Sequence, residues 1–221
     1  MMPPDPCDRG QTSVLSGWER THALIVVDVQ QGFDDPRWGR RNNPHCESNI
    51  AALIGQWRQR QWPVVFVRHD SRSPASPLSP TSAGNAFKSI LDGTPDVLIA
   101  KQTNSAFYGS PDLHRWLHEQ GVNAVVICGI TTNHCCETTA RMAGNLGYDT
   151  KFVLDATHTF DRRDLAGDWL SAEELSRVTA ANLHEEFATV LDTAHVLAEL
   201  DAASSDRESG GAGYRRRDAP R

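Results

Sequence analysis

Short runs of apolar, mostly β-branched residues recur along the chain, separated by longer segments in which apolar and polar residues mix. Six such runs stand out, at residues 23–29, 64–69, 97–101, 124–130, 151–156 and, more weakly, 188–191. Each run is bounded by polar or turn residues, which is the pattern of strands buried on both faces of a sheet. We therefore predict six buried strands.

The segments between these runs carry helix signals. Helices are expected over residues 47–61, from Ser110-Pro111 to Gly121, from about Thr132 to Gly147, and from Ser171 onward. Trp62-Pro63 stops the first helix, and Ser171 with Glu174 has the spacing of a capping box. Alternating strands and helices imply right-handed crossovers. The fold class expected is α/β, a three-layer α/β/α domain with Rossmann-like topology around an open, mostly parallel sheet of about six strands.

The two ends of the chain differ from its middle. Residues 1–17 are rich in Pro, Ser and Gly and lack periodicity, so we expect a flexible arm there. Residues 201–221 contain almost nothing to bury and are expected to form a disordered tail. One domain over residues 18–200 remains.

Composition and charge exclude several classes of protein. The chain has 221 residues and a formal net charge of −6, so no overall positive field favours a nucleic acid partner. No apolar run approaches the ~20 residues that span a bilayer, so no membrane partner is expected. The five cysteines form a poor disulfide framework, and the N-terminus lacks a signal-peptide pattern, which together predict a cytoplasmic protein.

Three reactive side chains follow three of the predicted strands: Asp28, Lys101 and Cys135. Each alone has an ordinary structural interpretation: the aspartate as a cap, the lysine as a solvated cation, and the cysteine as a small packed residue. The carboxyl ends of parallel strands, however, share one edge of the sheet. A helix N-terminus and a lysine both lower a thiol pKa, and a carboxylate can accept the thiol proton and pass it to a leaving amine. Together they predict hydrolysis of a carbonyl–heteroatom bond through a thioester.

Three sequence motifs resemble one family. They are 129-GITTNHCCETTARMAGNLGY-148, 25-IVVDVQQGF-33 and 99-IAKQTNSAFYGS-110. They resemble the isochorismatase-like cysteine hydrolases, which include nicotinamidases and N-carbamoylsarcosine, ureidoacrylate and maleamate amidohydrolases, and the resemblance covers about residues 22–192. It implies a catalytic triad of Asp28, Lys101 and Cys135, a cis peptide at Ile130–Thr131, and a homo-oligomer. It further implies an oxyanion site formed by the N–H groups of Thr131 and Cys135.

The same motifs leave choices at two positions. The pKa argument does not separate the two neighbouring cysteines, but the resemblance places the nucleophile six residues after Gly129, which implies Cys135. Cys136 is then expected to be packed or, less simply, in a vicinal disulfide. Nicotinamidase-like members bind a metal through an Asp-x-His pair after the second strand, whereas this chain has His69-Asp70 there. Two ligands are too few for such a site, so we expect no metal or other cofactor, and a structural role for His69.

The expected substrate is a small-molecule amide. Loop residues near the triad are candidates for binding it: Phe33, Trp38, Asn104, Phe107 and His134. The three aromatic residues are equally well explained by packing, Asn104 could orient a carbonyl or amide, and His134 could line the pocket or cap the helix. We expect cleavage of a non-peptide C–N bond, with a cyclic amide such as that of streptothricin-type antibiotics as the favoured substrate. A linear amide, carbamoyl or ureido substrate, an isochorismatase-type vinyl ether, and a non-catalytic binding protein on the same fold are the alternatives.

Overall fold

The computed structural model describes residues 18, 21–91 and 93–210, with side chains described to residue 205. Its centre is a six-stranded sheet in the order β3-β2-β1-β4-β5-β8, in which every neighbouring pair is parallel. The strands are β1 (Ala23–Val27), β2 (Val64–His69), β3 (Val97–Lys101), β4 (Ala124–Ile130), β5 (Asp149–His158) and β8 (Thr189–Leu191). The predicted fold class and all six predicted strands are confirmed.

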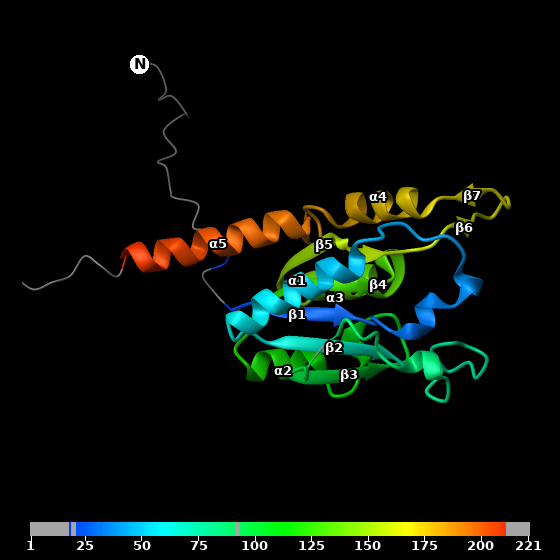
Figure 1. Cartoon of the computed structure of the whole chain (residues 1–221), viewed down its shortest axis with the longest axis horizontal. Helices are drawn as coiled ribbons and strands as arrows, with labels where there is room; N and C mark the ends of the chain where they lie inside the picture. The colour runs from blue at the N-terminus through cyan, green and yellow to red at the C-terminus, as the bar shows by residue number, and fades with distance from the viewer. Residues whose placement is uncertain (1–17, 19–20, 92, 211–221) are drawn as a thin grey trace, which may run out of the picture.

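Helices cover both faces of this sheet (Figure 1). One face packs against α1 (Cys46–Gln59) and α5 (Thr193–Gly210), and the other against α2 (Leu113–Glu119), α3 (Glu137–Asn145) and α4 (Ala172–Leu183). Strand β1 contributes apolar side chains to both faces. Leu24 and Val26 pack on the face covered by α1 and α5, and Ile25 and Val27 pack on the opposite face. Among the described helices, none combines the length and apolarity that a bilayer crossing requires.

The second helix begins later than predicted. Helix α2 begins at Leu113 and is capped by Asp112, whose side chain accepts a hydrogen bond from the Arg115 N–H at 3.0 Å. Ser110 is not the cap, since its backbone pairs with that of Ala100. The capping box at Ser171 and Glu174 is confirmed.

The C-terminal helix crosses a predicted boundary. Helix α5 runs to Gly210, so the domain end expected at residue 200 falls inside it, and residues 201–210 are helical. Leu200 is buried against the α1 side of the sheet, which gives this helix its anchor. The rest of the predicted tail, residues 211–221, and the predicted arm, residues 1–17, lie outside the described residues.

The sheet edge that carries the carboxyl ends of the strands is surrounded by long connections. The loops over residues 30–45 and 70–88 and a small antiparallel hairpin, β6 (Arg162–Arg163) with β7 (Trp169–Leu170), all gather at this end (Figure 1). Ligands of open parallel sheets bind at this edge, so the fold directs attention to it.

Gly129 allows β4 to approach β1 closely just before this edge. Its φ is +130°, and a Cβ atom there would lie 2.0 Å from the Val27 carbonyl oxygen. We expect Gly129→Ala to lower the free energy of unfolding by roughly 3 kcal/mol or more, because the strand must shift. Gly55→Ala, in the open interior of α1, is the matched control and should raise it by about 0.5–1 kcal/mol. Urea denaturation compares the two, and equal stabilities would refute the steric explanation.

Candidate active site

The structure brings Asp28, Lys101 and Cys135 together at the carboxyl edge of the sheet. Asp28 directly follows β1, Lys101 is the last residue of β3, and Cys135 lies in a π-helical turn, Thr132–Cys136, between β4 and α3. The Lys101 Nζ donates to Asp28 Oδ2 at 2.6 Å, and neither side chain is exposed. The Cys135 sulfur and a carboxylate oxygen of Asp28 lie within 4.8 Å of each other. The predicted peptide geometry is also present, since Ile130–Thr131 is cis.

The two carboxylate oxygens of Asp28 have different surroundings. Oδ2 accepts the hydrogen bond from Lys101, whereas Oδ1 is buried without a hydrogen-bond partner among the described residues. The backbone of Asp28 is held in place, because its N–H donates to the Val67 carbonyl at 2.9 Å. Oδ1 is therefore an available proton acceptor in the immediate vicinity of the thiol.

The Cys135 thiol is buried, with 8% of the residue exposed. Burial raises the pKa of this thiol far above its usual range, and the adjacent Asp28 carboxylate adds to the effect, while Lys101 opposes it. The lowered pKa expected for this thiol is therefore not found, since burial and the Asp28 carboxylate outweigh Lys101. The resting group is a thiol, and it needs a base to become a nucleophile.

His69 belongs to this cluster, although sequence reasoning assigned it a structural role. Its Nδ1 lies 3.2 Å from Lys101 Nζ, and its main chain is held by the Gln30 and Asn85 side chains. Burial and the Lys101 charge lower the pKa of His69, so the ring is neutral at pH 7. An ammonium group has only donors, so Nδ1 accepts this bond. His69 thus holds the Lys101 ammonium group by a second hydrogen bond, in addition to the one with Asp28.

Asp28, His69 and Cys135 also form the one described group of three potential metal ligands. Lys101 is hydrogen-bonded to two of them. Burial disfavours its ammonium form, but the Asp28 carboxylate outweighs burial and raises the pKa of Lys101. A divalent ion at this point would meet a positive charge at hydrogen-bond distance from its own ligands, so these residues do not fit a metal site.

Beside the cysteine lies a cavity of about 290 Å³, here called the inner cavity. Its lining includes four of the five predicted binding residues together with others: Phe33, Trp38, His69, Leu78, Asn104, Thr131, His134 and Cys135. Asn104 Oδ1 is 4.0 Å from the Cys135 sulfur. Phe107 is not part of this lining, because it stacks on Tyr148 with ring centroids 5.8 Å apart and packs on the core beneath α2 and α3. Leu78, from the loop after β2, was not predicted.

The neighbouring thiol is placed differently. Cys136 is fully buried in the core on the α3 side, and burial raises its pKa well above the usual value. Among the described cysteines, Cys46, Cys128, Cys135 and Cys136 are all free. The vicinal disulfide is therefore not formed, and the packed position expected for Cys136 is the one observed.

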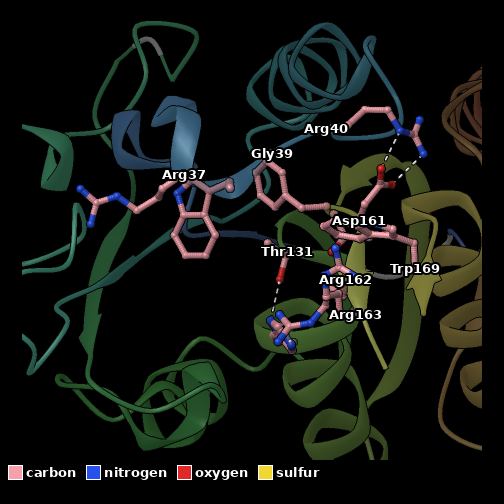
Figure 2. Close-up of a pocket in the computed structure, with 12 residues that line it drawn as sticks. Arg37, Gly39, Arg40, Thr131, Asp161, Arg162, Arg163 and Trp169 are labelled. Atoms are coloured by element: carbon pink, nitrogen blue, oxygen red, sulfur yellow. Dashed lines mark hydrogen bonds and ion pairs between the residues drawn. The ribbon is translucent and has the colours of Figure 1, made fainter. Parts of the chain in front are cut away.

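A second cavity of about 620 Å³, here called the outer cavity, adjoins the first. Trp38, Thr131 and His134 line both cavities. Its wall includes Phe160, which stacks on Trp38, and Arg40, which forms an ion pair with Asp161 (Figure 2). The two cavities therefore lie next to each other, with the three shared residues at their boundary.

His158 supports the aromatic wall of the outer cavity and makes stability depend on pH. Its ring packs edge-on against Phe160, is fully buried, and has no hydrogen-bond partner among the described residues. Burial, helped by the Arg41 charge, lowers its pKa to about 3 in spite of Glu47. Between pH ~6.5 and ~3 the unfolded chain binds a proton here that the folded protein does not.

We therefore expect the free energy of unfolding to fall as the pH falls below about 6.5, with His158 contributing up to about 1.4 kcal/mol per pH unit. His158→Leu should flatten this slope, whereas exposed His118→Gln should not. Urea denaturation at pH 7, 6 and 5 measures the slopes. An unchanged slope in His158→Leu would show that the ring is protonated in the folded protein.

The structure thus combines a six-stranded parallel α/β/α fold with an acid, a lysine and a buried cysteine at its carboxyl edge, a set of groups that suits a hydrolase. The isochorismatase domain model matches residues 22–195, and the chain belongs to the isochorismatase family. The chain is 43% identical over 176 residues to the isochorismatase family protein YrdC of Bacillus subtilis, covering 79% of this chain and 94% of YrdC.

Two further comparisons agree with this membership. Nicotinamidase 3 of Arabidopsis thaliana is 34% identical over 187 residues, covering 77% of this chain and 84% of that protein. An isochorismatase-family structure from Chromobacterium violaceum superposes with a TM-score of 0.78 at 40% identity, covering 82% of this chain and 94% of that one. The family resemblance inferred from the three motifs is confirmed.

Proposed function

We propose that this isochorismatase-family hydrolase is a cysteine amidohydrolase that cleaves a non-peptide C–N bond through a thioester on Cys135. The observation that carries the proposal is the buried Cys135 thiol beside the Asp28 carboxylate, which has one oxygen held by Lys101 and the other without a hydrogen-bond partner in the described part of the chain. A thiol needs a nearby base to attack a carbonyl, and Asp28 Oδ1 supplies it.

In the first half of the reaction, one proton moves from the Cys135 thiol to Asp28 and then from Asp28 to the leaving amine. As the Cys135 sulfur bonds to the substrate carbonyl carbon, its proton moves to Asp28 Oδ1. The carbonyl oxygen becomes an oxyanion, for which the N–H groups of Thr131 and Cys135 are the proposed donors. When the tetrahedral intermediate collapses, the C–N bond breaks and the amine leaves with the proton from Asp28. The product of this half is a thioester.

The second half uses the same base. A water molecule attacks the thioester carbonyl and gives a proton to Asp28. The C–S bond then breaks, the acid is released, and Asp28 returns the proton to the sulfur. Lys101 stays charged throughout, because its task is to hold Asp28 in place and balance its negative charge. Asn104, 4.0 Å from the sulfur, is placed to accept an N–H from the substrate amide.

The relatives favour a small amide. One is a ureidoacrylate amidohydrolase of Methylobacterium radiotolerans, which is 29% identical and covers 79% of this chain and 77% of that protein. Streptothricin hydrolase of Streptomyces noursei is 25% identical and matches 63% of this chain but only 50% of its own length. The inner cavity of about 290 Å³ suits the acyl part of a small linear amide, and a cyclic amide is the second candidate.

A panel of substrates tests the proposal. Linear primary amides, carbamoyl and ureido compounds, and lactams are assayed for release of ammonia or amine, with isochorismate as the vinyl-ether arm. We expect turnover of at least one C–N substrate and none of isochorismate. Turnover of isochorismate alone would contradict the proposal, and so would an absence of turnover throughout the panel, which is the result expected of a binding protein. Homo-oligomeric assembly and a cytoplasmic location stay predictions.

A further inference from the structure

Four arginines line the outer cavity: Arg37, Arg40, Arg162 and Arg163. They come from two segments, the loop after β1 and the β6–β7 hairpin, which face each other across the cavity (Figure 2). A basic lining in a protein of net charge −6 is a local feature rather than a consequence of composition. What each guanidinium already binds decides whether any is available to a ligand.

Three of the four are engaged within the protein. Arg37 pairs with Asp35 at 2.9 Å, and its side chain points away from the other labelled residues (Figure 2). Arg40 pairs with both Asp161 and Glu173, at 2.7 and 2.6 Å. The third, Arg163, lies over the Trp169 ring at 4.3 Å and donates to the Gly167 carbonyl.

Arg162 is the exception. It forms no ion pair with a carboxylate of the described residues, and its one side-chain hydrogen bond runs from Nη1 to His134 Nε2 at 3.3 Å. A guanidinium has five N–H donors and no acceptor, so Nε2 must accept and the ring proton is on Nδ1. That Nδ1 lies 3.3 Å from Thr131 Oγ1. Burial and the Arg162 charge lower the pKa of His134, which keeps the ring neutral.

The position of Arg162 relates it to the nucleophile. It is exposed and contacts His134, which with Thr131 lines both cavities and belongs to the turn that carries Cys135. A substrate with its amide at Cys135 and its other end in the outer cavity therefore passes beside His134 and ends near this guanidinium. Trp38 and Phe160 provide apolar walls for the hydrocarbon between the two ends.

We propose that Arg162 binds a carboxylate at the end of the substrate remote from the scissile amide, so that the substrate class is an amide that also carries a carboxylate. The planar guanidinium fork matches the two oxygens of a carboxylate, and such charge-assisted bonds are stronger than neutral ones. The inference rests on the proposed amidohydrolase function and adds the charge of the substrate and the residue that recognises it.

Matched substrates test this recognition. Succinamate carries a terminal carboxylate, and 4-oxopentanamide replaces it with a neutral methyl ketone of the same length. Glutaramate and 5-oxohexanamide are the pair one methylene longer. We expect the wild type to prefer one of the acids by about ten- to a hundredfold in kcat/KM, the range of a hydrogen-bonded charge. Arg162→Gln should remove this preference mainly through KM, so that the acid and its neutral counterpart are hydrolysed with similar kcat/KM.

Arg115→Gln is the control for net charge, because Arg115 is an exposed residue of α2 paired with Glu119. This variant should leave kcat/KM unchanged for both substrates of each matched pair. The inference is wrong if Arg162→Gln keeps the preference for the acid, or if it lowers kcat/KM equally for the acid and the neutral amide. Turnover of either amide would still support the proposed function.

A binding measurement separates the two proposals in the opposite case. Calorimetric titration of Cys135→Ala with succinamate and glutaramate measures recognition without turnover. If no amide is hydrolysed but one of these acids binds Cys135→Ala and not the Arg162→Gln/Cys135→Ala double variant, the proposed function fails and carboxylate recognition stands. If neither acid is bound or hydrolysed, the inference about Arg162 is overturned.

Discussion

Replacing Cys135 with alanine is expected to lower kcat by at least about 10⁴-fold, because the sulfur forms the covalent bond on which both halves of the reaction depend. Fold and stability should change little, since the residue loses one atom facing the inner cavity. Steady-state kinetics on the substrate found in the panel, with a urea denaturation of the same variant, measure both quantities. The two together distinguish a lost nucleophile from a lost fold.

Cys136→Ala is the matched control, a thiol one position along the chain and pointing into the core. It should keep kcat within a few-fold and lower the free energy of unfolding by about 1 kcal/mol, as the loss of a small buried group does. The reverse pattern, with Cys136→Ala inactive and Cys135→Ala active, would show that Cys136 is the nucleophile instead of Cys135. An unaffected Cys135→Ala would favour an ether-cleaving route that uses no thiol.

The second large effect concerns the buried pair of Asp28 and Lys101. Asp28→Asn and Lys101→Met each leave one charge buried without its partner, so each should lower the free energy of unfolding by about 3–5 kcal/mol. Each should also lower kcat by about 10²–10⁴-fold, since the first removes the base and the second removes the cation that holds it.

The double variant Asp28→Asn/Lys101→Met separates the structural role of this pair from the catalytic one. With both charges gone, stability should recover by several kcal/mol relative to the sum of the single effects. Activity should not recover, because the proton acceptor is still missing. The exposed pair of Arg115 and Glu119 is the control, with an expected coupling below about 1 kcal/mol. Additive stability losses, or an active double variant, would contradict this account of the pair.

The proximity of the three predicted triad residues could be foreseen from the sequence because strand ends in a parallel sheet share an edge. Asp28, Lys101 and Cys135 each stand at such an end, and the structure needs only the strand order to bring them together. His69 carried the same signal, since it is the last residue of β2. The absence of an Asp-x-His pair favoured a structural role for it, and only the pairing of His69 with Lys101 across β2 and β3 reveals their proximity.

Other features depended on burial and on loop paths, which the sequence does not show. The helix start suggested a lowered pKa for Cys135, yet desolvation raises it. Phe107 was a candidate for the site because of its place after β3, but its turn directs it toward Tyr148. Arg162 gave no signal at all, because the hairpin that carries it has strands of only two residues.

The central claim is that Cys135 carries the acyl group, and mass spectrometry of enzyme quenched in acid during turnover tests it most directly. The account predicts a mass increase equal to the acyl part of the substrate, on the peptide that contains Cys135 and on its sulfur rather than that of Cys136. The adduct should be absent from Cys135→Ala and sensitive to hydroxylamine, as a thioester is. Turnover with an adduct on another residue, or with unmodified Cys135 at every quench time, would contradict the account.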